Sequence, residues 1–216
     1  MKILKKYGDE ICNILSYCCC FLTIIVILGH ICYMLIFSNN ESNIKAKTEY
    51  RCDYINFSAN TKIQVYSVTP KEELLYTIEG DILKAFTNPL TLYDERQNHK
   101  EIMYAGDKYN YFSRNTHIIQ SKITNEILCD MEGHYQFIGD TYDLYVNDTQ
   151  VGTAKFHSEN KQGEVKTMSG DLIAEYYKAY FRKDYTVRVK KGNNIFTDET
   201  LLMIIAAYIC DCEHGN

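Results

Sequence analysis

Hydrophobic and polar positions along the chain form three patterns: a long uncharged run near the start, short alternating runs through the middle, and a short uncharged run near the end. The first run, 11–37, contains no Asp, Glu, Lys or Arg and exceeds the ~20 apolar residues that a helix needs to cross a bilayer. It is too long for a signal-peptide core, and no small-residue cleavage motif follows it. We therefore predict an uncleaved transmembrane anchor helix at 11–37 after a short basic tail at 1–10; a buried core helix is the alternative.

The middle of the chain has the pattern of short strands. From Thr61 onward, runs rich in β-branched and aromatic residues alternate with turn residues, as in TKIQVYSVT (61–69), EILCDM (126–131) and YDLYV (142–146). Such runs are typical of an all-β sandwich or barrel. Residues 38–60 are polar and mixed in charge, which predicts a stalk between the anchor and a β domain at 61–216.

The last run, from Thr200 to Cys210, has no charge and no polar face. As a helix it would reach only about 16 Å, too short for a hydrocarbon core of about 30 Å. A helix that is apolar all round must be surrounded by protein or lipid. We predict a helix at about 198–212, with Asp198 as its N-cap and Glu199 at the positive end of its dipole. A β-barrel closed around this helix would bury it and would also remove exposed sheet edges.

Four stretches carry a resemblance to a known superfamily: GDILKAFTNPLTLYDERQNHKEI, TYDLYVNDTQVGTAKF, GDLIAEYYKAYFRKDYTVRV and TDETLLMIIAAYICD, which span most of 75–211. In pattern and order they resemble the tubby C-terminal-like superfamily, especially its LURP-one-related branch, which also looks related to phospholipid scramblases. The resemblance implies a barrel of about twelve strands threaded by a C-terminal hydrophobic helix. It also implies phosphoinositide binding through basic residues, as in tubby domains. Plain LURP-one-related proteins lack an N-terminal anchor, so this chain departs from them there.

No pattern in the chain predicts catalysis or metal binding. The six His residues show no HExxH spacing, and Cys210, Cys212 and His214 lack a usual zinc spacing. We therefore expect no catalytic residue, no metal and no cofactor. The formal net charge of −5 gives no reason to expect a nucleic-acid partner. The four cysteines outside the predicted anchor, 52, 129, 210 and 212, leave the disulfide state open.

One basic stretch is the candidate site. Its six members lie within fourteen residues: Lys178, Arg182, Lys183, Arg188, Lys190 and Lys191. In a hairpin of 171–181 and 184–191, Lys178 and Arg182 would share one face, and Arg188 and Lys190 would share a face of the partner strand. Cations beside tyrosines suit an anionic lipid head group. An ordinary solvated strand face is the alternative.

These observations predict a single-pass protein of the cell membrane that acts as a non-enzymatic binding or regulatory module for anionic lipid, an envelope component or a protein partner. A scramblase-like lipid transport protein and an enzyme of unrecognised type are the alternatives. Three lysines precede the hydrophobic run, and Lys45, Lys47 and Arg51 follow it, so the positive-inside rule is nearly balanced. The tighter cluster before the run favours an N-terminus inside and a β domain outside the cytoplasm.

Overall fold

The computed structural model describes residues 23–28, 42, 44–57, 60–81, 89–107, 116–135, 140–157, 162–178 and 184–214. The chain divides into two units, 1–42 and 43–216. In the first, residues 23–28 are helical and the side chains of Ile24 to Leu28 are exposed. The rest of the predicted anchor at 11–37 lies outside the described residues. Among the residues that are described, no helix has the length and hydrophobicity that a bilayer crossing requires.

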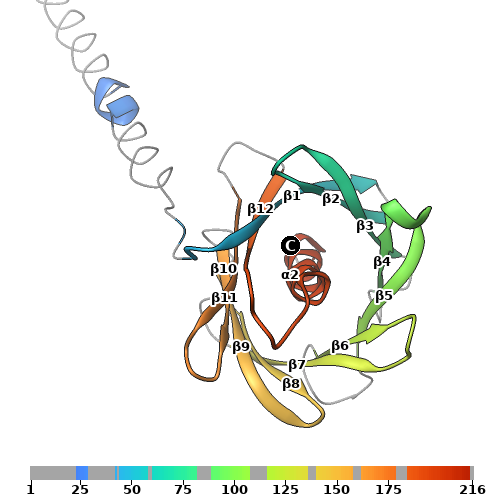
Figure 1. Ribbon diagram of the computed structural model, residues 1–216. Coiled ribbons are helices and arrows are strands. Elements are labelled where there is room, and N and C mark those ends of the chain that lie inside the picture. Colours follow the sequence, from blue (N-terminus) through green and yellow to red (C-terminus); the bar gives the residue numbers. More distant parts are fainter. Residues whose placement is uncertain are drawn as a thin grey trace, which may run out of the picture. The chain divides into compact units, whose positions relative to one another are not determined.

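The second unit is a closed barrel of twelve antiparallel strands (Figure 1). The strands are β1 (Lys47–Phe57), β2 (Asn60–Ser67), β3 (Glu73–Asp81), β4 (Leu90–Asp94), β5 (Lys100–Asp107), β6 (Thr116–Ser121), β7 (Ile127–Tyr135), β8 (Asp140–Val146), β9 (Thr149–His157), β10 (Gln162–Thr167), β11 (Leu172–Lys178) and β12 (Asp184–Lys190). Each strand pairs with the next, and β1 closes the circle by pairing with β12 from Lys47↔Lys190 to Asp53↔Asp184. A short 3-10 helix, η1 (Glu95–Gln97), connects β4 and β5.

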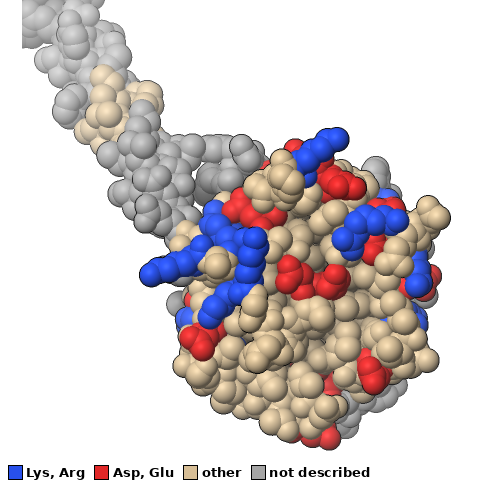
Figure 2. Space-filling view, in the orientation of Figure 1, with Lys and Arg blue, Asp and Glu red and all other residues tan. Residues whose placement is uncertain are grey.

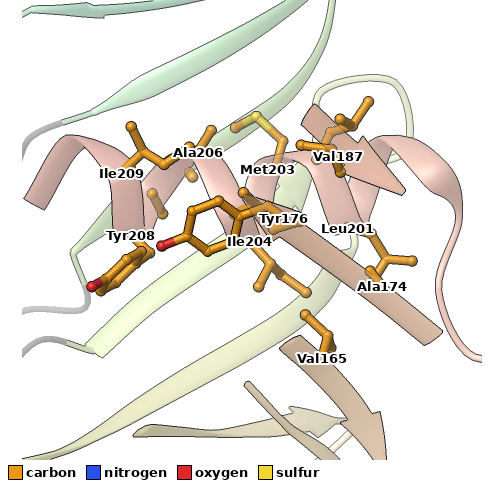
Figure 3. Packing of buried hydrophobic residues seen from close by; sticks show 14 of the residues in the cluster. Val165, Ala174, Tyr176, Val187, Leu201, Met203, Ile204, Ala206, Tyr208 and Ile209 are labelled. Carbon is orange, nitrogen blue, oxygen red and sulfur yellow. The ribbon is translucent and has the colours of Figure 1, made fainter. Parts of the chain in front are cut away.

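The helix α2 (Asp198–His214) runs through the inside of the barrel (Figure 1). Every residue from Thr200 to Cys210 is at most 3% exposed, because the inward side chains of the strands surround it. Ile204 points toward Val165 (Figure 3). The ring of Tyr208 stacks on Phe156 with centroids 4.0 Å apart. The prediction of a barrel with a C-terminal hydrophobic helix is confirmed, and the absence of a polar face on the helix is explained by the strands around it.

The cap of α2 differs from the prediction. Thr197, one residue before the predicted N-cap Asp198, accepts a hydrogen bond at its Oγ1 from the backbone N–H of Thr200 at 3.2 Å, and at its carbonyl from Leu201 at 3.1 Å. The first bond satisfies one of the N–H groups that a helix start leaves without an intrahelical partner, and the second is the first intrahelical bond of α2. The Asp198 carboxylate is thereby left for a tertiary contact.

The predicted stalk at 38–60 is wrong for residues 47–57, which form β1. Tyr50 and Cys52 point into the barrel and are about 5% exposed, while Glu49 and Arg51 alternate with them on the outer face. The mixed charge that indicated a stalk belongs to one face of a half-buried strand. The barrel therefore begins well before Thr61.

The buried cysteines are chemically quiet. Cys52, Cys129 and Cys210 are free thiols inside the barrel, so none of these three forms a disulfide. Burial raises the pKa of the Cys52 and Cys129 thiols to about 12. They stay protonated at neutral pH and lack the thiolate that oxidation or alkylation requires.

We expect Ile204→Asp to unfold the barrel. Ile204 is fully buried, and an unpaired buried carboxylate costs several kcal/mol against a total stability of roughly 5–15 kcal/mol. The measurement is the thermal transition of the β-sheet circular dichroism signal in the detergent-purified full chain. Ile123→Asp, at a position that is 61% exposed, is the matched control and should leave the transition in place. An unchanged transition in Ile204→Asp would contradict the threaded barrel.

Candidate functional site

The six basic residues predicted as one site do not share one surface. Lys178 follows the inward-pointing series of β11, where its Nζ lies 3.2 Å from the Tyr185 hydroxyl and 4.7 Å from the centroid of that ring. Arg188 and Lys190 belong to the outer face of β12. Arg182 and Lys183 lie outside the described residues. Lys178 therefore lies on the opposite face of the sheet from Arg188 and Lys190.

Arg188 is committed to contacts within the sheet. Its side chain is only 11% exposed. Its Nε donates to Glu49 at 2.8 Å, Nη1 to Glu175 at 3.3 Å and Nη2 to the Tyr177 hydroxyl at 2.8 Å, and the guanidinium also covers the Tyr177 ring. Arg188 of the predicted basic stretch is thus largely enclosed, because its guanidinium joins outward residues of β1, β11 and β12. Its positive charge is compensated by the two carboxylates.

Barrel closure creates a different basic surface, which we call the entrance cluster: Lys45, Lys47, Lys190 and Lys191. Lys47 of β1 lies directly opposite Lys190 of β12, and the backbone N–H of Lys191 donates to the Ala46 carbonyl at 2.8 Å. Lys and Arg side chains gather on the side of the barrel where β1 begins (Figure 2). The Glu49 carboxylate lies 3.8 Å from the Lys47 Nζ, and it is shared with Arg188.

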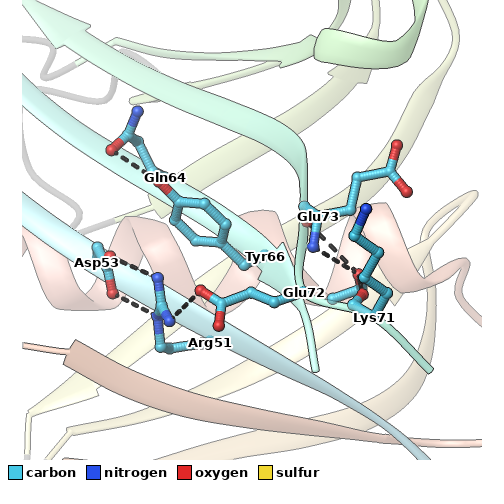
Figure 4. A network of polar contacts seen from close by, with 8 residues as sticks. Arg51, Asp53, Gln64, Tyr66, Lys71, Glu72 and Glu73 are labelled. Atoms are coloured by element: carbon cyan, nitrogen blue, oxygen red, sulfur yellow. Dashed lines mark hydrogen bonds and ion pairs between the residues drawn. The ribbon is translucent and has the colours of Figure 1, made fainter. Parts of the chain in front are cut away.

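Farther along β1 the charges are balanced. Arg51 donates through its Nε to Asp53 at 2.9 Å and through its Nη1 to Glu72 (Figure 4). Its guanidinium also lies 4.4 Å from the centroid of the Tyr66 ring. The surplus of positive charge on the outer face of β1 is therefore confined to the entrance cluster.

A second polar arrangement holds the start of α2 in the barrel mouth. The Tyr50 hydroxyl donates to Asp198 at 2.6 Å, and the Tyr76 hydroxyl donates to Glu199 at 2.5 Å. Burial raises the pKa of both tyrosines above their ordinary value, and the acceptor carboxylates raise it further. Both phenols therefore stay neutral donors at neutral pH, which suits anchoring of the helix rather than proton transfer.

This arrangement continues into η1. Arg96 donates through Nη2 to the Tyr76 hydroxyl at 2.9 Å. It also donates to the Asp94 carboxylate through both Nε and Nη2 at 3.0 Å. Asp94, with its side chain only 4% exposed, also accepts from Gln97 and from the backbone N–H of Arg96. Hydrogen bonds from Arg96 are the main cause that lowers the pKa of the Asp94 carboxyl. Strand, turn and helix are thus tied by one chain of charged contacts.

A pocket of about 520 Å³ lies beside the start of α2, lined by Tyr50 and residues 193–199. The Asn193 side chain in its lining is engaged within the protein. Asn193 accepts from the backbone N–H groups of Ile195 and Phe196, and its Nδ2 donates to the Phe196 carbonyl. Within the described part of the chain, no group of His, Cys, Asp and Glu side chains is arranged to hold a metal ion.

Comparisons with protein-family models, with curated proteins and with solved structures find no match to this chain. The candidate surface therefore stands on its geometry. Of its four lysines, Lys190 and Lys191 belong to the predicted basic stretch, whereas Lys45 and Lys47 were assigned to the stalk. The signal that could have joined them is the alternation of polar and apolar residues in 47–53, which marks a strand whose outer face carries Lys47.

We expect stability to fall with acidification through the Asp94 carboxyl. Because its pKa is lower in the folded protein than in the unfolded chain, its contribution is fully present above about pH 4 and is lost as the pH falls through the folded value. Asp94→Asn should lower the melting temperature at pH 7 and flatten its dependence on pH below about 4. The exposed Asp148→Asn is the matched control. Parallel pH profiles for Asp94→Asn and the unmodified chain would contradict this role.

Proposed function

We propose that this protein is a membrane-anchored, non-enzymatic binding module whose barrel recognises anionic lipid head groups through the entrance cluster. The observation that carries the proposal is the register pair Lys47↔Lys190 on the outer face of the closing strands. Like charges directly opposite one another destabilise a sheet. A phosphate-bearing head group held between the lysines would turn this repulsion into attraction.

The charge balance around the pair supports an anionic ligand. The entrance cluster and Arg188 supply five cations, while Glu49 and Glu175 supply the two carboxylates that contact Arg188. Lysine acts as a mobile point charge, which suits phosphate groups of varied geometry. Each Lys near an anionic membrane surface contributes about 1 kcal/mol of attraction.

The hydrophobic run supports a membrane location for the cluster. Nine residues lie between Phe37, the end of the predicted anchor, and Lys47, and the ten fully extended steps from Phe37 to Lys47 span at most about 35 Å. A short tether of this kind keeps a weak binding surface at high effective concentration beside the bilayer. The topology that we propose has the N-terminus inside and the barrel outside the cytoplasm.

The contents of the barrel favour binding on its outside. In the described part of the chain, α2 and the inward side chains fill the interior with buried residues. A scramblase-like lipid path through the barrel would have to displace this core. The closed barrel around α2 is also the fold that the tubby-like resemblance implies, and this supports the proposal that the chain is a distant, anchored member of that superfamily.

We expect the full chain to remain in the membrane pellet after alkaline carbonate extraction. Ile25→Lys combined with Leu28→Lys should release it, because each Lys at the centre of a spanning helix costs about 2.5–3.5 kcal/mol. The control combines Asn39→Lys and Asn40→Lys, which add the same charge beyond the hydrophobic run. Carbonate release of the unmodified chain would overturn the anchor.

We expect phosphatidylserine, added to the full chain in neutral detergent micelles, to raise the melting temperature, because a ligand that binds only the folded state stabilises it. Phosphatidylcholine should have no such effect. Lys47→Ser with Lys190→Ser should weaken the apparent affinity by about thirtyfold, from two lysines at about 1 kcal/mol each. The control, Lys100→Ser with Lys155→Ser, removes the same charge from two exposed lysines elsewhere on the barrel. Equal responses of the two double variants would overturn the entrance cluster as the site.

A further inference from the structure

Four exposed large hydrophobic side chains of the barrel lie in or beside connections at one end, the end whose connections the structure describes. In the described part of the barrel they are Val68, Ile123, Ile127 and Met168, with exposed fractions of 40%, 61%, 49% and 59%. Val68 lies in the β2–β3 connection, Ile123 and Ile127 in and after the β6–β7 turn, and Met168 in the β10–β11 turn. All three connections are at the end of the barrel where β1 begins and α2 starts, the end that faces the viewer in Figure 1. We call this end the apolar rim.

The three connections are evenly spaced around the rim. In the circular strand order, β2–β3, β6–β7 and β10–β11 are each separated by four strands. In two of the three gaps between them the connection is polar: η1 between β4 and β5, and the Asn147–Asp148 turn between β8 and β9. Isolated exposed apolar residues are ordinary on a protein surface, but three apolar tips in a ring define a plane that a flat partner can contact at once.

Lysines accompany the tips. Lys71 is three residues after Val68, and Lys122 precedes Ile123 and lies 4.9 Å from the centroid of the Tyr104 ring. Apolar side chains next to long cations fit the boundary between acyl chains and head groups, where the apolar part is buried and the ammonium reaches the phosphates. Exposed carboxylates of Glu126, Asp148 and Asp171 lie on the same rim, so charge alone does not select a partner.

The course of the chain identifies the partner. β1 starts at this rim, so the segment that connects the barrel to the hydrophobic run 11–37 arrives here and not at the opposite end. We propose that the apolar rim docks on the bilayer, with Val68, Ile123 and Met168 inserted among the lipid head groups. This inference rests on the proposed anchor, and it adds a defined orientation: the axis of the barrel stands upright on the membrane, with the start of α2 facing the lipid.

The chain contains no tryptophan, so one introduced tryptophan is a unique reporter. The full chain is reconstituted in phosphatidylcholine–phosphatidylserine vesicles as Val68→Trp, Ile123→Trp or Met168→Trp. The matched control is Lys155→Trp, at an exposed position on the outer side of β9. Fluorescence is measured with brominated acyl chains in the lipid and with acrylamide in the water.

We expect the three rim tryptophans to be quenched by brominated lipid at least about twofold more than Lys155→Trp, and to be shielded from acrylamide. Rim tryptophans that match Lys155→Trp in both quenchers, in chains that float with the vesicles, would overturn the docking and leave the anchor intact. Rim tryptophans shielded from acrylamide but not quenched by lipid would also overturn it, in favour of a protein partner or a second copy. Chains that do not float would overturn the anchor and the docking together.

Discussion

The burial of α2 is the constraint on which the rest of the structure depends. Eleven consecutive residues of this helix, Thr200 to Cys210, have no polar face, and isolated helices of this length are marginal in water. The helix gains its stability from side chains that point inward from strands all around it. The strands in turn need the helix, because a twelve-stranded barrel is too wide for its own side chains to fill. Neither part forms a core alone.

Because apolar side chains surround α2 along its length, polar contacts that position the helix can form only at the ends of the barrel. The acidic start of α2 is favoured by the helix dipole, and it is fixed by phenols from β1 and β3. The phenols are inward residues of their strands, so Tyr50 and Tyr76 contact the core with their rings and the mouth with their hydroxyls. Arg96 then connects the Tyr76 hydroxyl to η1. These polar contacts fix the depth and rotation of α2 in the barrel, and hydrophobic packing supplies the stabilising free energy.

The fold was predictable where apolar and polar residues follow a regular pattern along the sequence. Strands such as 142–146 alternate apolar and polar residues, and the apolar run at 200–210 admits few interpretations other than a surrounded helix. β1 was missed because Glu49, Arg51 and Asp53 dominate its composition and hide the inward Tyr50 and Cys52. β10 carries a weaker strand signal because Gly163 is one of its inward residues: a Cβ there would lie 2.4 Å from the rings of Phe156 and Tyr176, so a large side chain is excluded at that position.

The candidate site was predictable only in part, for a related reason. Lys190 and Lys191 stand in a visibly basic stretch, but their neighbours Lys45 and Lys47 are brought to them by closure of the barrel. Local sequence also cannot show that Arg188 is enclosed by Glu49 and Glu175, which come from strands on both sides. Pairing across a closed sheet therefore decides which cations have surplus charge, and no window of a single hairpin contains that information.

The pairing of β1 with β12 also determines the order in which the protein can be completed during translation. Asp53 can pair with Asp184 only after the ribosome has added that residue, 131 residues later, and α2 is synthesised later still. Until then the nascent sheet is an open ribbon with an uncovered apolar face, the kind of intermediate that aggregates or binds chaperones. The alternating charges on the outer face of β1 protect that waiting edge, because charged side chains on an edge strand discourage pairing with other chains.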